Sequence, residues 1–217
     1  MYNKSKILPS RIIGVSLKNS SSKLWTQRGT KLGKMAAYGL IAGFVSSIAI
    51  SGLLLLVEKS ISLPIGTFYL MLSSAFIESQ NYLDNIILGF ILHLITGSIL
   101  GLIMSIPFIA FKDKLVKSLQ KYAVAYGLGF GFALWVFLFI PITMWIILPI
   151  LDDSQDKTVI QEVPAEADVM FSTDKLAILL DRIIIGAVAF NMLYGLLVAI
   201  IIKTFSESRL KDESNVI

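Results

Sequence analysis

The sequence predicts an all-α integral membrane protein with four transmembrane helices. Two observations lead to this fold class: four long apolar runs without charged residues, and an uneven distribution of Lys and Arg over the segments between them. Hydrophobic residues make up 55% of the 217 residues and charged residues only 16%, whereas a soluble domain has about 25% charged residues. This composition is typical of a chain whose surface faces lipid.

The four apolar runs cover residues 35–57, 86–111, 122–151 and 183–202, and contain 23, 26, 30 and 20 residues. A bilayer core of about 30 Å requires about 20 helical residues, so each run is long enough to span it. Backbone groups in lipid must form hydrogen bonds within their own segment, which makes these runs helices. The third run exceeds this length and contains Pro141, where we expect a kink, a tilted helix, or both.

Two further prolines lie in these runs. Pro107 is near the inner end of the second run, where it would kink or end the helix. Pro149 is near the outer end of the third run, and with Trp145 it is expected at the outer membrane interface.

The distribution of basic residues predicts the orientation. Segments 1–34, 112–121 and 203–217 carry eight, four and three Lys or Arg residues, against one in 58–85 and three in 152–182. Cytoplasmic segments of membrane proteins are enriched in Lys and Arg. Both termini and the short 112–121 connection are therefore predicted to be cytoplasmic, and 152–182 is predicted to be an acidic outer loop.

The tail at residues 1–34 allows two interpretations. Its eight basic and no acidic residues favour a cytoplasmic tail on anionic lipid, where each charge contributes about 1 kcal/mol. A Ser- and Lys-rich segment without acids is also typical of a mitochondrial transit peptide. We prefer the first interpretation, which places the protein in the plasma membrane.

The first outer connection contains an apolar stretch at residues 62–77. It is too apolar for an ordinary solvated loop and too short to span a bilayer. Two placements remain open: an interfacial segment, or a re-entrant segment that enters the membrane and returns.

The chain also shows an internal repeat. Residues 37–44 and 125–132 are identical at six of eight positions, at an offset of 88. The second and fourth runs carry small or polar residues at a spacing of four, at an offset of 98: Gly89, His93, Gly97 and Gly101 against Ala187, Asn191, Gly195 and Ala199. We predict two tandem hairpins, 35–111 and 122–202, in the same orientation and related by an axis along the membrane normal.

Small residues at a spacing of four also indicate how the helices pack. Membrane helices associate through close backbone approach at such residues. In the first run the stripe continues through Ser47 and Ser51. Either these faces build a compact monomeric bundle, or some of them receive another membrane protein or a second copy of this chain. The predicted packing residues are Gly39, Gly43, Gly89, Gly97, Gly101, Gly127, Gly131 and Gly195.

A polar site is predicted inside the membrane. His93 is the single histidine of the chain, and it lies about 10 Å from the outer end of its run. Asn191 lies about 12 Å into the fourth run, so the two side chains could share a hydrogen bond at one level. Thr96 and Tyr194 would add polar lining. The pair would form a structural hydrogen bond between helices, or it would act as a proton relay or permeation site. As a third possibility, His93 would bind haem or a metal.

Several function classes are excluded by what the sequence lacks. Without cysteine there is no disulfide or thiolate chemistry, and one histidine cannot form a His-cluster metal site. No P-loop, HExxH motif or nucleophile elbow is present. The basic tail lacks the interleaved aromatic residues that nucleic-acid binding favours. We therefore expect no cofactor, no metal and no nucleic-acid partner.

These observations predict a non-enzymatic membrane protein that acts through helix–helix contacts, as a subunit or assembly partner in a membrane complex. Its expected partners are the lipid bilayer and another membrane protein or a second copy of the chain. The alternative is a small transporter or channel with a polar intramembrane site around His93 and Asn191.

Overall fold

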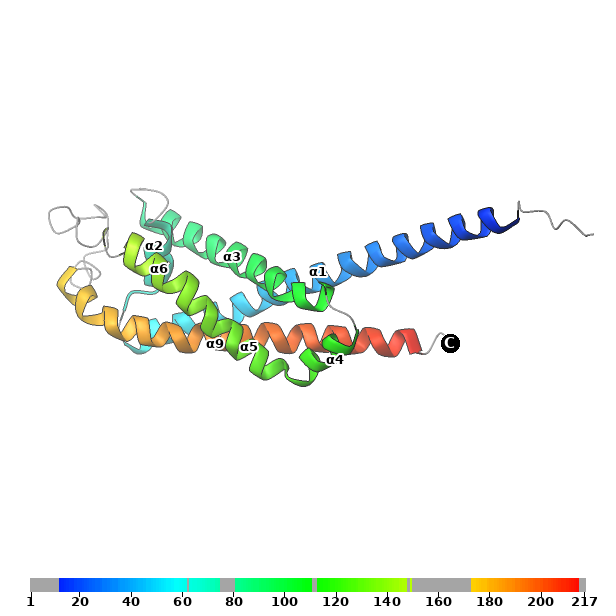
Figure 1. Ribbon diagram of the computed structural model, residues 1–217. Helices are drawn as coiled ribbons and strands as arrows, with labels where there is room; N and C mark the ends of the chain where they lie inside the picture. The colour runs from blue at the N-terminus through cyan, green and yellow to red at the C-terminus, as the bar shows by residue number, and fades with distance from the viewer. Residues whose placement is uncertain are drawn as a thin grey trace, which may run out of the picture.

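The computed structural model describes residues 12–61, 63–74, 81–110, 113–147, 149 and 173–214. All regular structure in these ranges is helical, and the helices run lengthwise through an elongated molecule (Figure 1). Residues 150–172, which include most of the predicted outer loop, fall outside these ranges, as do residues 1–11 of the N-terminal tail. The elements are α1 (Ile12–Ser60), α2 (Thr67–Ser74), α3 (Tyr82–Ala110), α4 (Asp113–Lys121), α5 (Ala123–Leu134), η1 (Trp135–Phe139), α6 (Ile140–Ile142), η2 (Thr143–Ile147) and α9 (Thr173–Ser214).

Four helical segments are long and apolar enough to cross a membrane: Leu32–Ser60, Tyr82–Phe108, Ala123–Trp145 and Ile183–Ser208. Each overlaps one of the four apolar runs. Only 17% to 33% of the most apolar part of each segment is buried inside the protein, so most of its side chains face the surroundings. The prediction of an all-helical protein with four candidate spans is therefore confirmed. The repeat and the orientation stay predictions.

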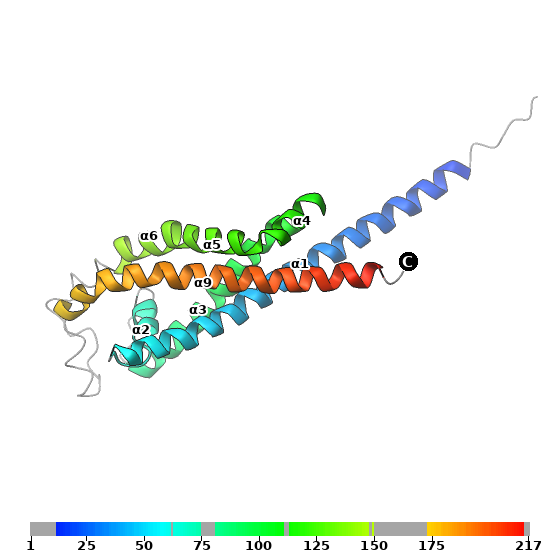
Figure 2. The same cartoon turned by 90° about the horizontal axis from the view of Figure 1, so that it is seen from below.

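The four long segments pack as two pairs. Helix α3 packs most extensively on α1, and α5 on α9, while α1 also contacts α9 and joins the pairs. In the view from below, α9 lies between α5 and α1 (Figure 2). The first turns of α1 and the last turns of α9 project from the same end of the molecule as α4, and α2 lies at the opposite end (Figures 1 and 2).

Glycines bring α1 and α3 into backbone contact. A Cβ atom added to Gly43 would overlap the carbonyl oxygen of Gly97. A Cβ atom at Gly39 would lie 2.5 Å from Ser105 Oγ and 2.8 Å from the carbonyl oxygen of Gly101. These distances are too short for any larger residue, and the small-residue faces of the two helices pack against each other.

A second set of glycines joins α5 to α9. A Cβ atom at Gly127 would lie 2.6 Å from the carbonyl oxygen of Gly195 and 2.8 Å from Ala199 Cβ. A Cβ atom at Gly131 would overlap the carbonyl oxygen of Asn191. The two helix pairs thus use the same kind of contact, with Gly127 and Gly131 in the places of Gly39 and Gly43.

The register of this second pair differs from the one expected. Gly39 meets the carbonyl of Gly101, whereas Gly127 meets the carbonyl of Gly195. The contacts therefore relate α3 to α9 by an offset of 94 residues, and the sequence pattern suggested 98. The difference of four residues is about one helical turn.

The two prolines predicted to disturb helices do so differently. Helix α3 continues past Pro107 to Ala110. Around Pro141 the hydrogen bonding changes: the N–H of Ile140 donates to the carbonyl of Trp135, five residues earlier, and π-helical segments η1 and η2 flank α6. The expected disturbance at Pro141 therefore takes the form of widened π turns, which absorb the missing N–H of proline without ending the helix.

Hydrogen bonds and stacked rings also connect the two pairs. The hydroxyl of Tyr126 donates to the carbonyl of Met104 at 2.9 Å, and the ring of Tyr38 stacks on Phe205 at 4.8 Å between centroids. The core between the four helices is formed by Met35, Ala42, Ile50, Met104, Phe108, Ala123, Tyr194, Val198, Ala199 and Ile202.

Candidate functional site

Helix α2 is anchored to the end of α1 by a buried carboxylate. Glu58 is only 5% exposed, and its two oxygens accept hydrogen bonds from the N–H groups of Gly66 and Phe68, both at 2.7 Å. The first N–H groups of a helix have no partner within the helix, and a negative charge there is favoured by the helix dipole. The Glu58 carboxylate thus caps the N-terminus of α2.

A tight turn directs the chain from α1 into α2. Gly66 has a φ of 92°, a left-handed conformation that residues with a Cβ atom rarely adopt. A Cβ atom there would also lie 2.8 Å from the side chain of Ile86. The Thr67 hydroxyl donates to the carbonyl of Pro64 at 2.6 Å and closes the turn. This turn places α2 against α3 instead of extending it away from the bundle.

Helix α2 packs on α3 at backbone distance. A Cβ atom at Gly89 would overlap the carbonyl of Tyr69, so this predicted packing glycine serves α2. Tyr69 and Ser73 are 2% and 0% exposed. The described part of the 62–77 stretch is therefore a short helix seated on α3. Its aromatic rings reach His93, about 16 Å along α3 from its first residue at 1.5 Å per residue.

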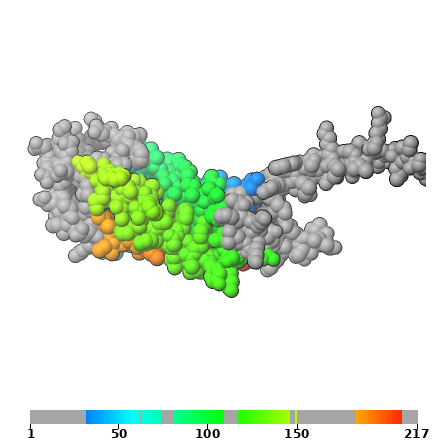
Figure 3. All heavy atoms as spheres, viewed as in Figure 1, coloured from blue at the N-terminus to red at the C-terminus, as the bar shows by residue number. Residues whose placement is uncertain are grey.

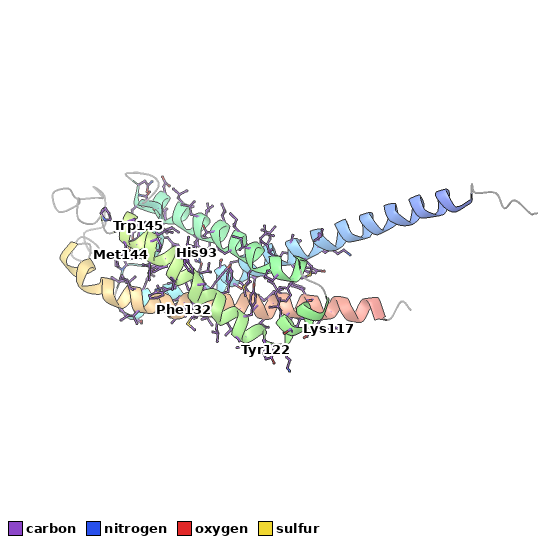
Figure 4. The ribbon with its side chains drawn as sticks, in the orientation of Figure 1. His93, Lys117, Tyr122, Phe132, Met144 and Trp145 are labelled. Atoms are coloured by element: carbon purple, nitrogen blue, oxygen red, sulfur yellow. The ribbon has the colours of Figure 1, made fainter. Side chains whose placement is uncertain are left out.

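His93 lies beneath α2 and between its aromatic side chains. The imidazole makes edge contacts with the rings of Phe68 and Tyr69, at centroid distances of 5.7 Å and 6.0 Å. It also lies beside the backbone of Ser47 on α1. Figure 4 places His93 in the half of α3 toward α2, and Lys117 and Tyr122 at the other end of the bundle.

Four side chains form a buried polar cluster at this point: Ser47, Ser51, Tyr69 and His93. Ser47, Ser51 and Tyr69 are 0%, 4% and 2% exposed. The three hydroxyls and His93 Nε2 are buried, and none has a partner at hydrogen-bonding geometry among the described residues. The cluster joins α1, α2 and α3, since a Cβ atom at Gly97 would overlap Ser47 Oγ. We refer to these four residues as the polar cluster.

The Tyr69 hydroxyl stays neutral in this setting. Burial is the main cause that raises its pKa; the nearby Ser51 hydroxyl opposes this effect, and the Glu58 carboxylate adds to it. A neutral phenol both donates and accepts hydrogen bonds.

The structure separates the side chains that the sequence placed in one polar site. The Asn191 amide donates to the carbonyl of Ala187 in its own helix at 2.8 Å. Within the part of the chain that the structure describes, no hydrogen bond joins His93 to Asn191. Thr96 is exposed on the outside of α3 and does not line an interior site.

Tyr194 has a different position from the other predicted site residues. Its hydroxyl is buried and donates to the carbonyl of Gly97 at 2.5 Å, which ties α9 to α3 one turn from His93. This bond links the two helix pairs near the polar cluster, and it leaves no free hydroxyl proton for a ligand.

Three residues of the polar cluster were absent from the predicted site. Ser47 and Ser51 continue the small-residue stripe of the first run at a spacing of four, and this spacing already placed them on the face that packs on α3. Tyr69 could not be assigned because its helix is neither a span nor a solvated loop. The available signal was the apolar 62–77 stretch with an acidic residue, Glu58, shortly before it.

The chemistry of the polar cluster is that of neutral hydrogen-bonding groups. It contains no carboxylate and no Lys or Arg. Within the described residues there is no group of three or more His, Cys, Asp or Glu side chains that could hold a metal ion.

No protein-family model, no curated protein and no solved structure matches the chain. The architecture alone defines its class. Four candidate membrane spans indicate a polytopic membrane protein with an integral membrane location.

Proposed function

We propose that this protein is a non-enzymatic plasma-membrane protein that acts through helix–helix contacts, as a subunit or assembly partner in a membrane complex. The observation that carries the proposal is a stripe of small residues on the outer face of α5: Ala125, Gly129 and Ala133, at a spacing of four. Ala125 and Gly129 are exposed and Ala133 is half-buried.

The stripe differs from the small-residue faces between the paired helices, which are occupied by the neighbouring helix. Gly127 and Gly131 of the same helix lie against α9. Gly129 faces the other way, and a Cβ atom there would have nothing within 4 Å. A helix of another chain could approach α5 here as closely as α1 and α3 approach each other.

The space-filling view supports the accessibility of this surface. The face seen in Figure 3 is formed largely by α5 and its continuation, with α3 beside them. Phe132, Phe137 and Trp145 are 48%, 79% and 78% exposed along the same segment, and Phe132 and Trp145 are labelled in Figure 4. Exposed apolar rings are ordinary in lipid, so the stripe of small residues carries the proposal and the rings do not.

The proposed orientation places both termini in the cytoplasm. The first turns of α1, the last turns of α9 and α4 lie at one end of the molecule (Figure 1). The described parts of the three basic segments lie at that end (Figure 1), and the three segments together contain fifteen of the chain's 19 Lys and Arg residues. This asymmetry is typical of the cytoplasmic side.

We also propose that the chain consists of two tandem hairpins with a common origin. The support is the shared motif at residues 37–44 and 125–132, whose glycines make equivalent contacts with α3 and α9.

The proposal is tested by purification in a mild detergent, with bound proteins identified by mass spectrometry. We expect a partner membrane protein, or a second copy of the chain, to co-purify with the natural protein. Gly129→Leu places a bulky side chain in the α5 stripe and should release the partner. Gly52→Leu is the matched control, because Gly52 is also exposed and has nothing within 4 Å of an added Cβ atom.

Two outcomes would contradict the proposal. One is a natural protein that remains a monomer without a partner in native-lipid nanodiscs. The other is equal retention, or equal loss, of the partner in the two glycine variants, because the contact would then not depend on the α5 stripe.

The transporter or channel alternative has less support. It requires a polar site shared by His93 and Asn191, and the Asn191 amide instead has a partner in its own helix. Thr96 faces outward and would not line a path between them.

A further inference from the structure

The polar cluster contains more hydrogen-bonding groups than the surrounding protein satisfies. Four polar atoms are buried without a partner at hydrogen-bonding geometry among the described residues: the hydroxyl oxygens of Ser47, Ser51 and Tyr69, and His93 Nε2. An unpaired buried polar group costs about 1–3 kcal/mol, and a bilayer offers no solvent to relieve that cost. Four such groups in one place indicate a ligand.

The four groups lie next to one another. The ring centroids of Tyr69 and His93 are 6.0 Å apart, and the imidazole lies beside the backbone of Ser47. Ser51 lies one turn from Ser47 on the same face of α1, close enough to Tyr69 to affect its ionisation. The four residues therefore lie together where α1, α2 and α3 meet.

The imidazole indicates what such a ligand must offer. His93 Nε2 has no partner at hydrogen-bonding geometry among the described residues. In a neutral imidazole each ring nitrogen is either a donor or an acceptor, according to the tautomer. The three hydroxyls can each donate or accept. A fitting ligand is one that both donates and accepts.

The charge of the polar cluster and its tight packing narrow the class of possible ligands further. The polar cluster has no cationic side chain for an anion and no carboxylate for a cation. The nearest acid, Glu58, uses both oxygens to cap α2. The close contacts at Gly89 and Gly97 hold α2 and α1 tightly on α3, so a ligand of the polar cluster must be a very small molecule.

We propose that the polar cluster is a binding site for water, enclosed between α1 and α3 and covered by α2. A buried water typically makes about three hydrogen bonds to polar groups that would otherwise be unpaired. One or two water molecules would satisfy the four groups and connect the three helices through hydrogen bonds nearly as favourable as direct ones. This site is separate from the α5 surface and does not depend on it.

The single histidine makes the proposal testable without assignment problems, because ¹⁵N-labelled histidine reports on His93 alone. The measurement is solid-state NMR in bilayers, with transfer of magnetisation from water to the imidazole nitrogens. We expect transfer in the natural protein and its loss when Ser47→Ala and Ser51→Ala are combined. Ser98→Ala is the matched control, since that α3 hydroxyl already bonds the Leu94 carbonyl at 2.8 Å; transfer should persist in it.

Absence of transfer in the natural protein would overturn the proposal, and so would undiminished transfer in the double serine variant. If that variant does not fold, a high-resolution structure of the natural protein decides. Density for water within hydrogen-bonding distance of at least two of the four atoms supports the site. Well-resolved side chains without such density refute it.

Discussion

The two helix pairs share one packing device and differ at the end of the molecule where α2 lies. Both pairs are held by glycines that bring backbones into contact, at Gly43 with Gly97 and at Gly131 with Asn191. The first pair then adds α2, whose N-terminus is capped by Glu58. The second pair instead has π turns around Pro141. The glycine contacts join the helices of each pair. The capped α2 and the π turns then make the two pairs different from each other.

The register of the two pairs shows that contacts between glycines do not fix how far one helix is shifted along the other. A stripe of small residues at a spacing of four looks the same after a shift of one helical turn. The glycines therefore specify that two helices meet, but not at which turn. In the second pair the backbone of Asn191 occupies the place that Gly97 has in the first, and this difference accompanies the shift of four residues.

The sharpest way to break the comparison is to enlarge one glycine in each pair. Gly43→Leu and Gly131→Leu should each lower the free energy of unfolding by about 3 kcal/mol, because the atoms they would meet are backbone atoms that cannot move aside. Reversible unfolding in mixed micelles measures this change. Gly52→Leu, with nothing within 4 Å, should stay within about 0.5 kcal/mol of the natural protein. Tolerance of Gly131→Leu alone would show that the pairs do not share the same packing.

A smaller effect is expected from removing the Glu58 cap of α2, which belongs to the first pair. Glu58→Gln keeps the size of the side chain but removes the charge and one of the two acceptors for α2. Hydrogen bonds to a charged group contribute about 1.5–3 kcal/mol each. Backbone amides of α2 should therefore exchange with deuterium much faster, whereas those of α5 and α9 keep their natural rates. Equal acceleration in both pairs would mean that the cap supports the whole protein and not α2 alone.

The smallest effects concern the hydrogen bonds between the pairs. Tyr194→Phe and Tyr126→Phe each remove a bond to a carbonyl of α3, from Gly97 and from Met104. An interhelical bond in a membrane contributes about 0.6 kcal/mol on average. The acceptors are about 10 Å apart along α3, so the two losses in unfolding free energy should add. Tyr122→Phe changes an exposed tyrosine and serves as the control. If the double variant loses far more unfolding free energy than the sum of the single losses, the two bonds act as one unit.

The number and type of the spans could be predicted from the sequence because the hydrocarbon of the bilayer determines them. An uncharged apolar run in lipid forms a helix, since its backbone groups must pair within the segment. The length of the run determines whether the helix crosses the bilayer. The small-residue faces of α1 and α3 could be read from the spacing of Gly39, Gly43, Gly97 and Gly101, but not that these two helices meet, because such a face can equally receive another chain. These features depend on the composition of a segment and not on its partners.

The polar contacts could not be predicted in the same way. Asn191 has enough reach to bond a carbonyl one turn earlier, so it needs no partner from another helix. His93 meets aromatic rings of α2, a helix whose position depends on a cap supplied from elsewhere in the chain. Depth in the membrane can be counted along a sequence, but the direction in which a side chain points depends on the helix that arrives beside it.

The backbone contact between Gly89 and Tyr69 also has a consequence for biosynthesis. Residue 89 emerges from the ribosome after residue 69, so the surface that receives α2 does not exist when α2 is made. The segment must wait, held at its start by Glu58, until the next span has entered the bilayer. We expect a membrane-inserted chain truncated between these positions and released from the ribosome to leave Tyr69 open to chemical labelling, and full-length chains to protect it.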